Sequence, residues 1–117
     1  MRHRLALLFI IAVIAVPIGA ILSGFVSTHR RMAEFRTTIL PGMTLAELRR
    51  FAGKPEKILR KGEPLRAARR SYTVPALDDH TALYFYPRSG TPYYNVYVFI
   101  DERENKVVNS HVENLGW

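Results

Sequence analysis

An uncharged apolar run near the start of the chain, LALLFIIAVIAVPIGAILSGFV from Leu5 to Val26, limits what this sequence can fold into. About 20 such residues in an α-helix span roughly 30 Å, the thickness of the hydrocarbon core of a bilayer. The run therefore predicts a transmembrane anchor within residues 1–27. The rest of the 117-residue chain is long enough for one small domain.

The same segment also has features of a cleaved signal peptide. Arg2 and Arg4 precede an apolar stretch that Pro17 interrupts, and Gly19 and Ala20 are small enough to mark a cleavage site. Because the apolar sequence continues past Ala20, an uncleaved anchor is favoured. We expect a single-pass protein of the bacterial inner membrane with its C-terminal domain in the periplasm, since a very short N-terminal tail usually stays cytoplasmic. Release after cleavage is the alternative.

Charge and cysteine content narrow the classes of function. The chain has no cysteine, which excludes disulfides, a thiolate nucleophile and a lipidated N-terminal cysteine. Its formal net charge is +7, and the positive excess lies in the first half, because most of the acidic residues lie in the second half. Basic residues beside a membrane helix attract anionic headgroups, whereas no nucleic-acid motif accompanies the charge. Candidate contacts with anionic lipid are Arg30, Arg31, Arg36, Arg49 and Arg50, although for the last two an ordinary solvated helix face is favoured.

The stretch PGMTLAELRRFAGKP, residues 41–55, predicts a short helix with defined ends. Thr44 and Glu47 form the Thr-x-x-Glu pattern of a capping box. Gly53 suits the left-handed position after a helix, and Pro55 prevents continuation. A helix this short needs a partner for its apolar side. That side is predicted to comprise Leu45, Leu48, Phe51 and Ala52.

Three later runs, residues 81–86, 93–100 and 106–113, are rich in β-branched and aromatic residues and are separated by turn sequences. In the polar loop DERENK, Asn105 is suited to a positive φ. Alternation predicts an aliphatic face for the short helix to cover, with Val108, Ser110 and Val112 on one face of the last strand. The expected fold is α+β, with short helices on a three-stranded antiparallel sheet within residues 39–117, and residues 28–38 as a linker. The conformation of residues 56–80 is ambiguous, with an edge strand favoured near residues 70–74.

The other face of the sheet is expected to be aromatic. Such a face is a candidate surface for a protein partner, because tyrosine is enriched at interfaces. The alternative is cross-strand packing that only stabilises the sheet. The residues of this candidate partner surface are Tyr84, Tyr86, Tyr93, Tyr97 and Phe99.

Residues with catalytic or metal-binding chemistry are sparse. Asp78, Asp79 and His80 are adjacent, but a solvated loop capped by these side chains is favoured over a cation site. The acidic residues 101, 102 and 104 lie in a predicted hairpin loop, where polar residues are expected. No nucleophile elbow, phosphate-binding glycine loop or zinc-binding helix motif is present. We expect no catalytic residues, no cofactor and no metal.

The residues 41–55 quoted above resemble the signature of the SmpA/OmlA (BamE-like) domain. YVFIDERENKVV, residues 97–108, is similar to the closing hairpin of that family. The resemblance implies an α+β fold, an envelope location and a non-catalytic accessory role, and the best-known members assist assembly of outer-membrane β-barrel proteins. It implies structural roles for the matching residues Gly42, Met43, Gly53 and Pro55. Those members are lipoproteins, whereas this chain has an apolar run and no cysteine.

These observations together predict a membrane-anchored interaction or assembly-support module of the cell envelope that is not an enzyme. Its expected partners are the membrane and another envelope protein, and not nucleic acid. The alternative is a secreted or periplasmic inhibitor or ligand-binding domain, released when the signal peptide is cleaved.

Overall fold

The computed structural model describes residue 24 and residues 26–67, 69–90 and 92–116. The predicted transmembrane segment therefore lies almost entirely outside the described residues. Among the helices formed by the described residues, none has the length and apolar character needed to cross a membrane.

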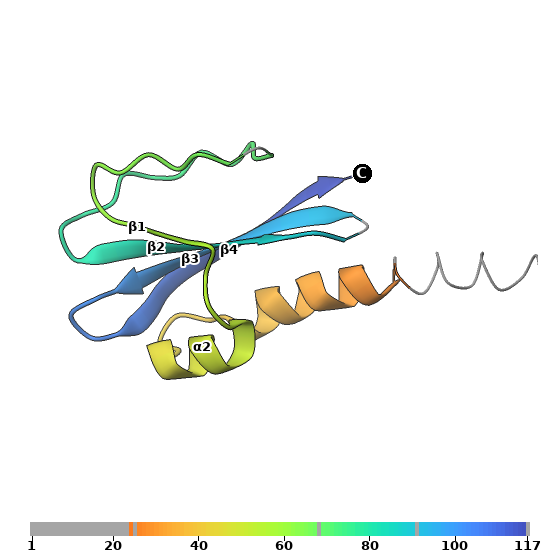
Figure 1. The fold of residues 1–117 in the computed structure, drawn as a ribbon. Helices are drawn as coiled ribbons and strands as arrows, with labels where there is room; N and C mark the ends of the chain where they lie inside the picture. The colour runs from red at the N-terminus through yellow and green to blue at the C-terminus, as the bar shows by residue number, and fades with distance from the viewer. Residues whose placement is uncertain (1–23, 25, 68, 91, 117) are drawn as a thin grey trace, which may run out of the picture.

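The described chain forms three layers (Figure 1). The middle layer is an antiparallel sheet with the strand order β1-β2-β3-β4. Two helices cover one face, and an irregular segment of residues 60–80, which we name the strap, covers the other. The strands are β1 (Lys57–Leu59), β2 (Thr81–Arg88), β3 (Tyr93–Asp101) and β4 (Lys106–Gly116).

The α+β class is confirmed, but the sheet has four strands instead of the expected three. The additional strand is β1, which pairs with residues Leu83 to Phe85 of β2. The edge strand expected near residues 70–74 is wrong, because these residues form no strand and belong to the strap. Their apolar side chains pack down onto the sheet without extending it.

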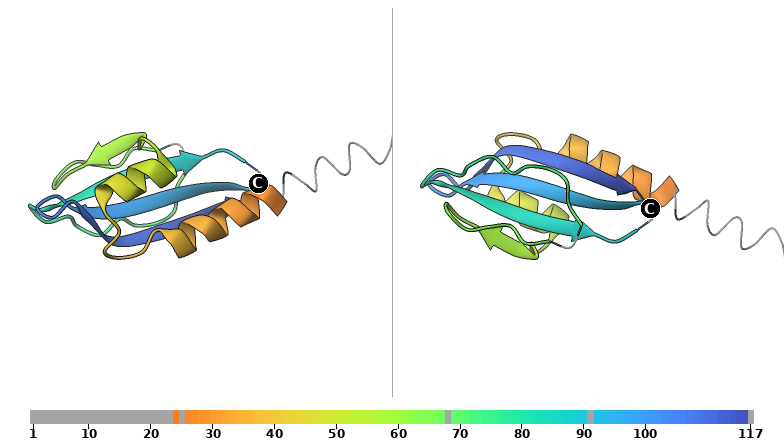
Figure 2. Two further views of the ribbon diagram at one scale, coloured as in Figure 1. Left: turned by 90° about the horizontal axis from the view of Figure 1, so that it is seen from below. Right: turned by 90° about the horizontal axis from the view of Figure 1, so that it is seen from above.

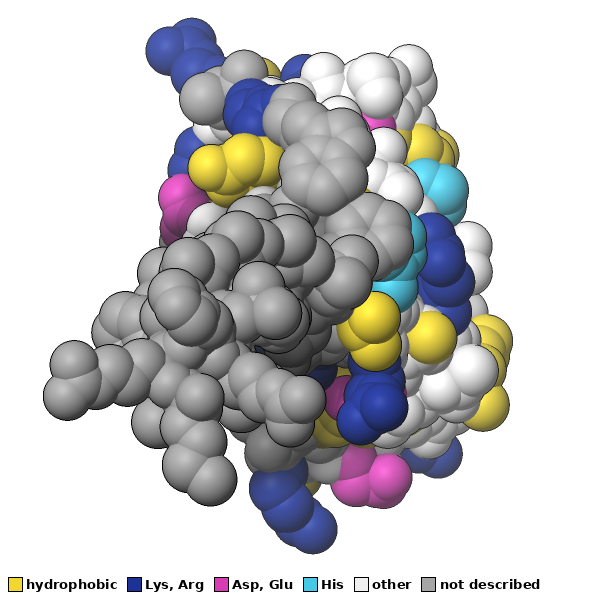
Figure 3. Space-filling view, turned by 90° about the vertical axis from the view of Figure 1, so that its right-hand side faces the viewer, with side chains coloured by type: hydrophobic (Ala, Val, Ile, Leu, Met, Phe, Trp, Pro, Cys, Tyr) yellow, Lys and Arg dark blue, Asp and Glu magenta, His cyan; other side chains and the backbone are white. Residues whose placement is uncertain are grey.

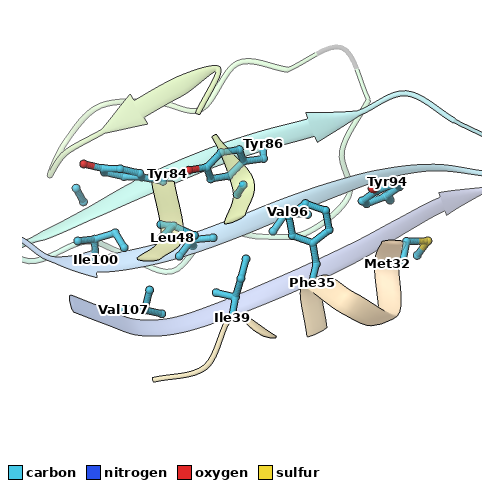
Figure 4. Packing of buried hydrophobic residues seen from close by; sticks show 13 residues of the cluster. Met32, Phe35, Ile39, Leu48, Tyr84, Tyr86, Tyr94, Val96, Ile100 and Val107 are labelled. Atoms are coloured by element: carbon cyan, nitrogen blue, oxygen red, sulfur yellow. The ribbon is translucent and has the colours of Figure 1, made fainter. Parts of the chain in front are cut away.

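Residues 26–38 form a helix that runs along β4 on the lower face of the sheet (Figure 2). The expectation that residues 28–38 are a linker is therefore wrong. Met32, Phe35 and Ile39, the last just beyond the helix, are each only 1% exposed and belong to the core. Their spacing of three and four residues places them on one side of a helix. Figure 4 shows these side chains directed toward the sheet.

The short helix α2 (Leu45–Ala52) is confirmed with both predicted ends. The Thr44 hydroxyl accepts a hydrogen bond from the Glu47 N–H at 3.1 Å and donates one to the Glu47 carboxylate at 2.9 Å. The carboxylate thus bonds the threonine hydroxyl instead of its backbone N–H, which is a variation on the capping box. At the other end, Gly53 has a φ of 76° and donates its N–H to the Arg49 carbonyl at 2.9 Å.

The turn before α2 is attached to β4 by backbone hydrogen bonds. Gly42 donates to the Val107 carbonyl and Val107 donates to the Met43 carbonyl, each at 2.8 Å. Leu45 donates to the Asn105 carbonyl at 2.8 Å. Gly42 has a φ of 93°, a conformation that glycine adopts without steric cost. The start of α2 is therefore fixed to the β3–β4 hairpin, which explains its defined boundary.

The predicted aliphatic face packs against the helices. Val96, Val98 and Ile100 of β3 are fully buried there with Leu48 of α2 (Figure 4). The alternation expected for β4 is wrong at Val108, which is 48% exposed. Phe99 pairs with Asn109, whereas Ile100 pairs with Val107. A bulge therefore leaves Val108 outside the register.

Pro87 lies within β2, where proline requires a free edge. The Phe85 carbonyl accepts a hydrogen bond from the Glu56 N–H at 2.9 Å, so Phe85 directs its backbone groups toward β1. Two residues later, Pro87 faces the same side. β1 pairs only as far as Phe85, so the sheet loses no ladder hydrogen bond at Pro87.

Candidate functional site

The outer face of the sheet, opposite the helices, is the candidate functional site. It forms a second apolar cluster, separate from the helix-covered core, and the strap lies over it. Four strap side chains, Ala67, Tyr72, Val74 and Leu77, are partly buried against this cluster. The buried members are Leu59, Leu65, Leu83, Phe85, Tyr97 and Phe99.

The five aromatic residues expected at a partner surface do not form one exposed surface. Tyr84 and Tyr86 face the helices and are 5% and 2% exposed. Burial raises the pKa of Tyr86 to about 12. Tyr97 and Phe99 lie on the opposite face, buried beneath the strap. Tyr93 alone is substantially exposed, at 40%.

Two polar strand residues hold the strap on this face. Asn95 and Glu113 are cross-strand partners in β3 and β4, and both are buried. Asn95 donates its side-chain amide to the Arg69 carbonyl at 2.8 Å and to Glu113 Oε1 at 3.2 Å. The other carboxylate oxygen, Glu113 Oε2, accepts the Ser71 N–H at 2.9 Å, the Ser71 hydroxyl at 2.8 Å and the Tyr72 N–H. We name Asn95 and Glu113 the clasp.

The clasp is extended by Tyr97, whose hydroxyl donates to Glu113 Oε1 at 2.8 Å. Burial by itself raises the pKa of Glu113, but the hydrogen bonds from Tyr97, Ser71 and Asn95 outweigh it and the pKa is lowered. Burial is the largest cause that raises the pKa of Tyr97, and the hydrogen bond to Glu113 is the second. Glu113 is therefore an ionised acceptor and Tyr97 a protonated donor at neutral pH.

A carboxylate, a tyrosine and a serine grouped together resemble components of an acid–base site. Here both oxygens of Glu113 are engaged by donors from the strap and the sheet. The residue is 7% exposed, which leaves little access for a substrate. Its geometry fits a structural attachment, because buried charges are retained where hydrogen bonds compensate their loss of water.

The strap is attached to the sheet mainly through side chains. Among the described residues, no backbone-to-backbone hydrogen bond joins residues 61–79 to a strand. Near the strap's ends, Arg60 donates two hydrogen bonds to Glu102, at 2.9 and 2.8 Å, and Lys61 pairs with Asp79 at 3.1 Å. These side chains are largely exposed, and pairs of this kind contribute about 0–1 kcal/mol. Lys57 of β1 also donates its ammonium group to the Arg66 carbonyl. The clasp makes four hydrogen bonds to strap atoms and is the principal polar attachment.

Aromatic contacts reinforce the clasp. The Tyr72 ring stacks on His111 with centroids 4.1 Å apart and packs against Tyr97 at 4.8 Å. At the tip of the strap, the Arg69 guanidinium lies 4.4 Å from the centre of the Tyr93 ring. The arm of the strap from residue 69 to residue 74 is thus held by one continuous set of contacts.

Two grooves flank the strap. One, of about 440 Å³, lies beneath its tip, and its lining includes four basic residues, Lys57, Arg66, Arg69 and Arg88. The second, of about 610 Å³, lies between residues 61–65 and residues 73–77 of the strap. Its lining is largely apolar and includes Leu65 and Leu83. A third groove, of about 560 Å³, lies on the helix side, between the start of α2 and the β3–β4 turn.

The five candidate lipid contacts all belong to the helix layer. Arg30, Arg31 and Arg36 are exposed on the helix of residues 26–38. Arg31 pairs with Glu34 at 3.3 Å. Figure 3 views the molecule from the end at which this helix begins, and Lys and Arg side chains lie on several sides of that end.

The remaining two candidates, Arg49 and Arg50, lie on α2. Arg50 is exposed, in agreement with a solvated face. Arg49 is half-buried, because its guanidinium lies 5.5 Å from the centre of the Tyr84 ring. Arg49 thus contributes to packing between α2 and β2.

The acidic residues near residues 78–80 and 101–104 take part in loop structure. Asp78 accepts the His80 N–H at 2.9 Å, and Asp101 accepts the Arg103 N–H at 2.9 Å. Hydrogen bonds lower the pKa of both, that of Asp78 chiefly through Thr81 and that of Asp101 chiefly through the Arg103 backbone. In the part of the chain that the structure describes, no three His, Asp or Glu residues are grouped as metal ligands.

Sequence reasoning did not identify the clasp. Asn95 and Glu113 were visible as polar residues within predicted strands, and a correct register of the hairpin places them opposite each other. The bulge at Val108 shifts that register by one residue. The strap, whose backbone the clasp binds, has no periodic pattern that indicates where it lies.

In comparisons with known proteins, the chain matches no protein-family model, no curated protein and no solved structure. The assignment of function therefore depends on the residues and contacts described above.

Proposed function

We propose that this protein is a membrane-anchored interaction module that supports assembly in the cell envelope and has no catalytic activity. The observation that carries the proposal is the junction between the apolar run and the domain. Val26 ends the uncharged run and already belongs to the helix that places Met32 and Phe35 in the core.

The junction is short and packed. The β2–β3 turn approaches the start of the helix so closely that a Cβ added at Gly90 would lie 3.1 Å from the Thr28 hydroxyl oxygen. Thr28 is two residues beyond the uncharged run. A segment inserted in a bilayer up to Val26 would hold the domain directly at the membrane surface, where exposed Arg30 and Arg36 are attracted to anionic headgroups.

The orientation and compartment belong to the same proposal. A short N-terminal tail in the cytoplasm and the domain in the periplasm give a single-pass protein of a bacterial inner membrane. The assembly-support role is supported by the resemblance of residues 41–55 and 97–108 to the SmpA/OmlA signature. Among these residues, Gly42 lies in a turn with positive φ and Gly53 caps α2. The outer face of the sheet is the proposed surface for a protein partner.

Fractionation of cells that express the full chain with a C-terminal epitope tests the anchor and the orientation. The chain should remain in membranes washed with alkaline carbonate, and protease should remove the epitope only after the outer membrane is opened. A variant with Ile10→Arg and Ile14→Arg should leave the membrane fraction, because charges at the centre of an apolar run oppose insertion. If the protein without these substitutions were recovered entirely in the wash and began near Ile21, the result would support the released ligand-binding domain instead.

A further inference from the structure

We propose that the outer face of the sheet is a receptor for an extended apolar peptide of another protein, and that the strap occupies this receptor in cis. The inference rests on the proposed interaction role and names its surface and the class of its partner.

The first observation is the way in which the strap is bound. Glu113 accepts two consecutive backbone N–H groups, those of Ser71 and Tyr72, and Asn95 donates to the Arg69 carbonyl. Side chains that bind the backbone recognise an extended chain with little regard for its exact sequence. The ionised carboxylate makes these hydrogen bonds stronger than neutral ones.

The second observation is the character of the floor. Leu83, Phe85 and Phe99 present a continuous apolar surface beneath the strap. Tyr72, Val74 and Leu77 of the strap contact it at intervals of two and three residues. The strap itself therefore shows the chemistry of a suitable occupant. It has apolar side chains at such intervals, and two consecutive backbone N–H groups, those of Ser71 and Tyr72, that Glu113 accepts.

The third observation is that the strap can leave without breaking the sheet. Residues 61–79 make no backbone-to-backbone hydrogen bond with a strand among the described residues. The helix-covered core contains no strap residue. Among the described residues of the strap, Leu65 alone is buried, and a segment without ladder bonds opens at lower free energy than the strands. A partner with a stronger peptide of the same type can therefore displace the strap.

The test uses the full chain in detergent micelles and a fluorescein-labelled synthetic peptide that corresponds to residues 62–78, with fluorescence anisotropy as the readout. Ser71→Pro in the protein removes the N–H and the hydroxyl that the strap offers to Glu113. Because this change weakens only the cis occupant, the affinity for the labelled peptide should rise at least roughly tenfold. Thr73→Pro is the matched control, because Thr73 is exposed and the described hydrogen bonds do not involve it, and it should bind peptide as the wild type does.

Two further variants separate the receptor from the occupant. Adding Glu113→Ala to Ser71→Pro should abolish the gain, since the receptor loses its acceptor. A peptide with proline at the Ser71 position should not bind any of the proteins. Hydrogen exchange should show release of residues 65–77 in Ser71→Pro, with protection retained in β2 and β3.

A released strap without any gain in peptide affinity would overturn the inference, and so would a strap that stays protected in Ser71→Pro. If Ser71→Pro does not fold, the wild type at high peptide concentration decides. There, the labelled peptide should bind and its proline variant should not, and equal binding of the two would also overturn the inference. A chain that remains in washed membranes yet takes up no peptide contradicts this inference and leaves the proposed function intact.

Discussion

At the scale of single residues, Glu113 has the largest expected effect on the outer layer. Replacing it by glutamine keeps the size of the side chain and removes the charge that accepts hydrogen bonds from Ser71, Tyr72 and Tyr97. We expect Glu113→Gln to lower the free energy of unfolding at pH 7 by about 1–3 kcal/mol. Denaturant titration measures the change, with Glu104→Gln in the exposed hairpin loop as the neutral control.

The pH dependence of stability gives a second test of Glu113. Its pKa is lower in the folded protein than the ordinary value of 4.5, so its contribution is present above that value and is lost as pH falls through the folded pKa. The wild type should therefore lose stability more steeply than Glu113→Gln as the pH falls below 4.5. Parallel curves for the two proteins across this range would show that Glu113 is not the ionised acceptor.

At the scale of elements, the helix of residues 26–38 is part of the domain. Phe35 is 1% exposed, and its ring packs against Phe51 at 5.2 Å and Tyr94 at 6.0 Å. Phe35→Ala should lower the free energy of unfolding by about 3–5 kcal/mol, because it removes a buried ring and leaves a cavity. Arg36→Ala, one residue away on the exposed side, should change it little. Equal effects of the two changes in denaturant titration would contradict the orientation of this helix.

The short helix α2 provides a matched pair of its own. Leu48 is fully buried, so Leu48→Asp should unfold the domain by placing an unpaired charge in the core. Arg50→Glu lies on the exposed side and should leave the fold intact. Far-ultraviolet circular dichroism and thermal melts distinguish the two outcomes. A folded Leu48→Asp protein would mean that α2 does not close the core.

The elements differ in how far the sequence predicts them. α2 and the positive φ of Asn105 follow from local chemistry, because a cap, a terminal glycine and a turn residue each act within a few residues. The pairing of β1 with β2 joins segments more than twenty residues apart and has only three residues of pattern. The helix of residues 26–38 was not predicted, because it begins at the end of the apolar run and carries several charged residues.

The candidate site was the least predictable part. Alternation along β3 correctly separates an aliphatic face from an aromatic one, but it does not show what covers the aromatic face. The cover is the strap, an irregular segment rich in proline and arginine whose position depends on Asn95 and Glu113. Irregular segments acquire their place from tertiary contacts, and single-sequence patterns do not record those contacts.

At the scale of the whole molecule, two unlike layers cover the two faces of one sheet. The helix layer connects directly to the apolar run, and its side chains Met32, Phe35 and Leu48 are buried in the core. The strap layer is held by side chains and flanked by grooves of about 440 and 610 Å³. Under the proposed function, the helix layer adjoins the membrane surface and the strap layer exchanges with a partner.

The mass of the mature protein recovered from carbonate-washed membranes tests the central claim most directly. An uncleaved anchor predicts that the pellet contains the intact chain of 13.4 kDa, beginning at the original N-terminus. A protein found only in the wash, with a mass that lacks the segment before Ile21, would show that the apolar run is removed and that the domain works without a membrane tether.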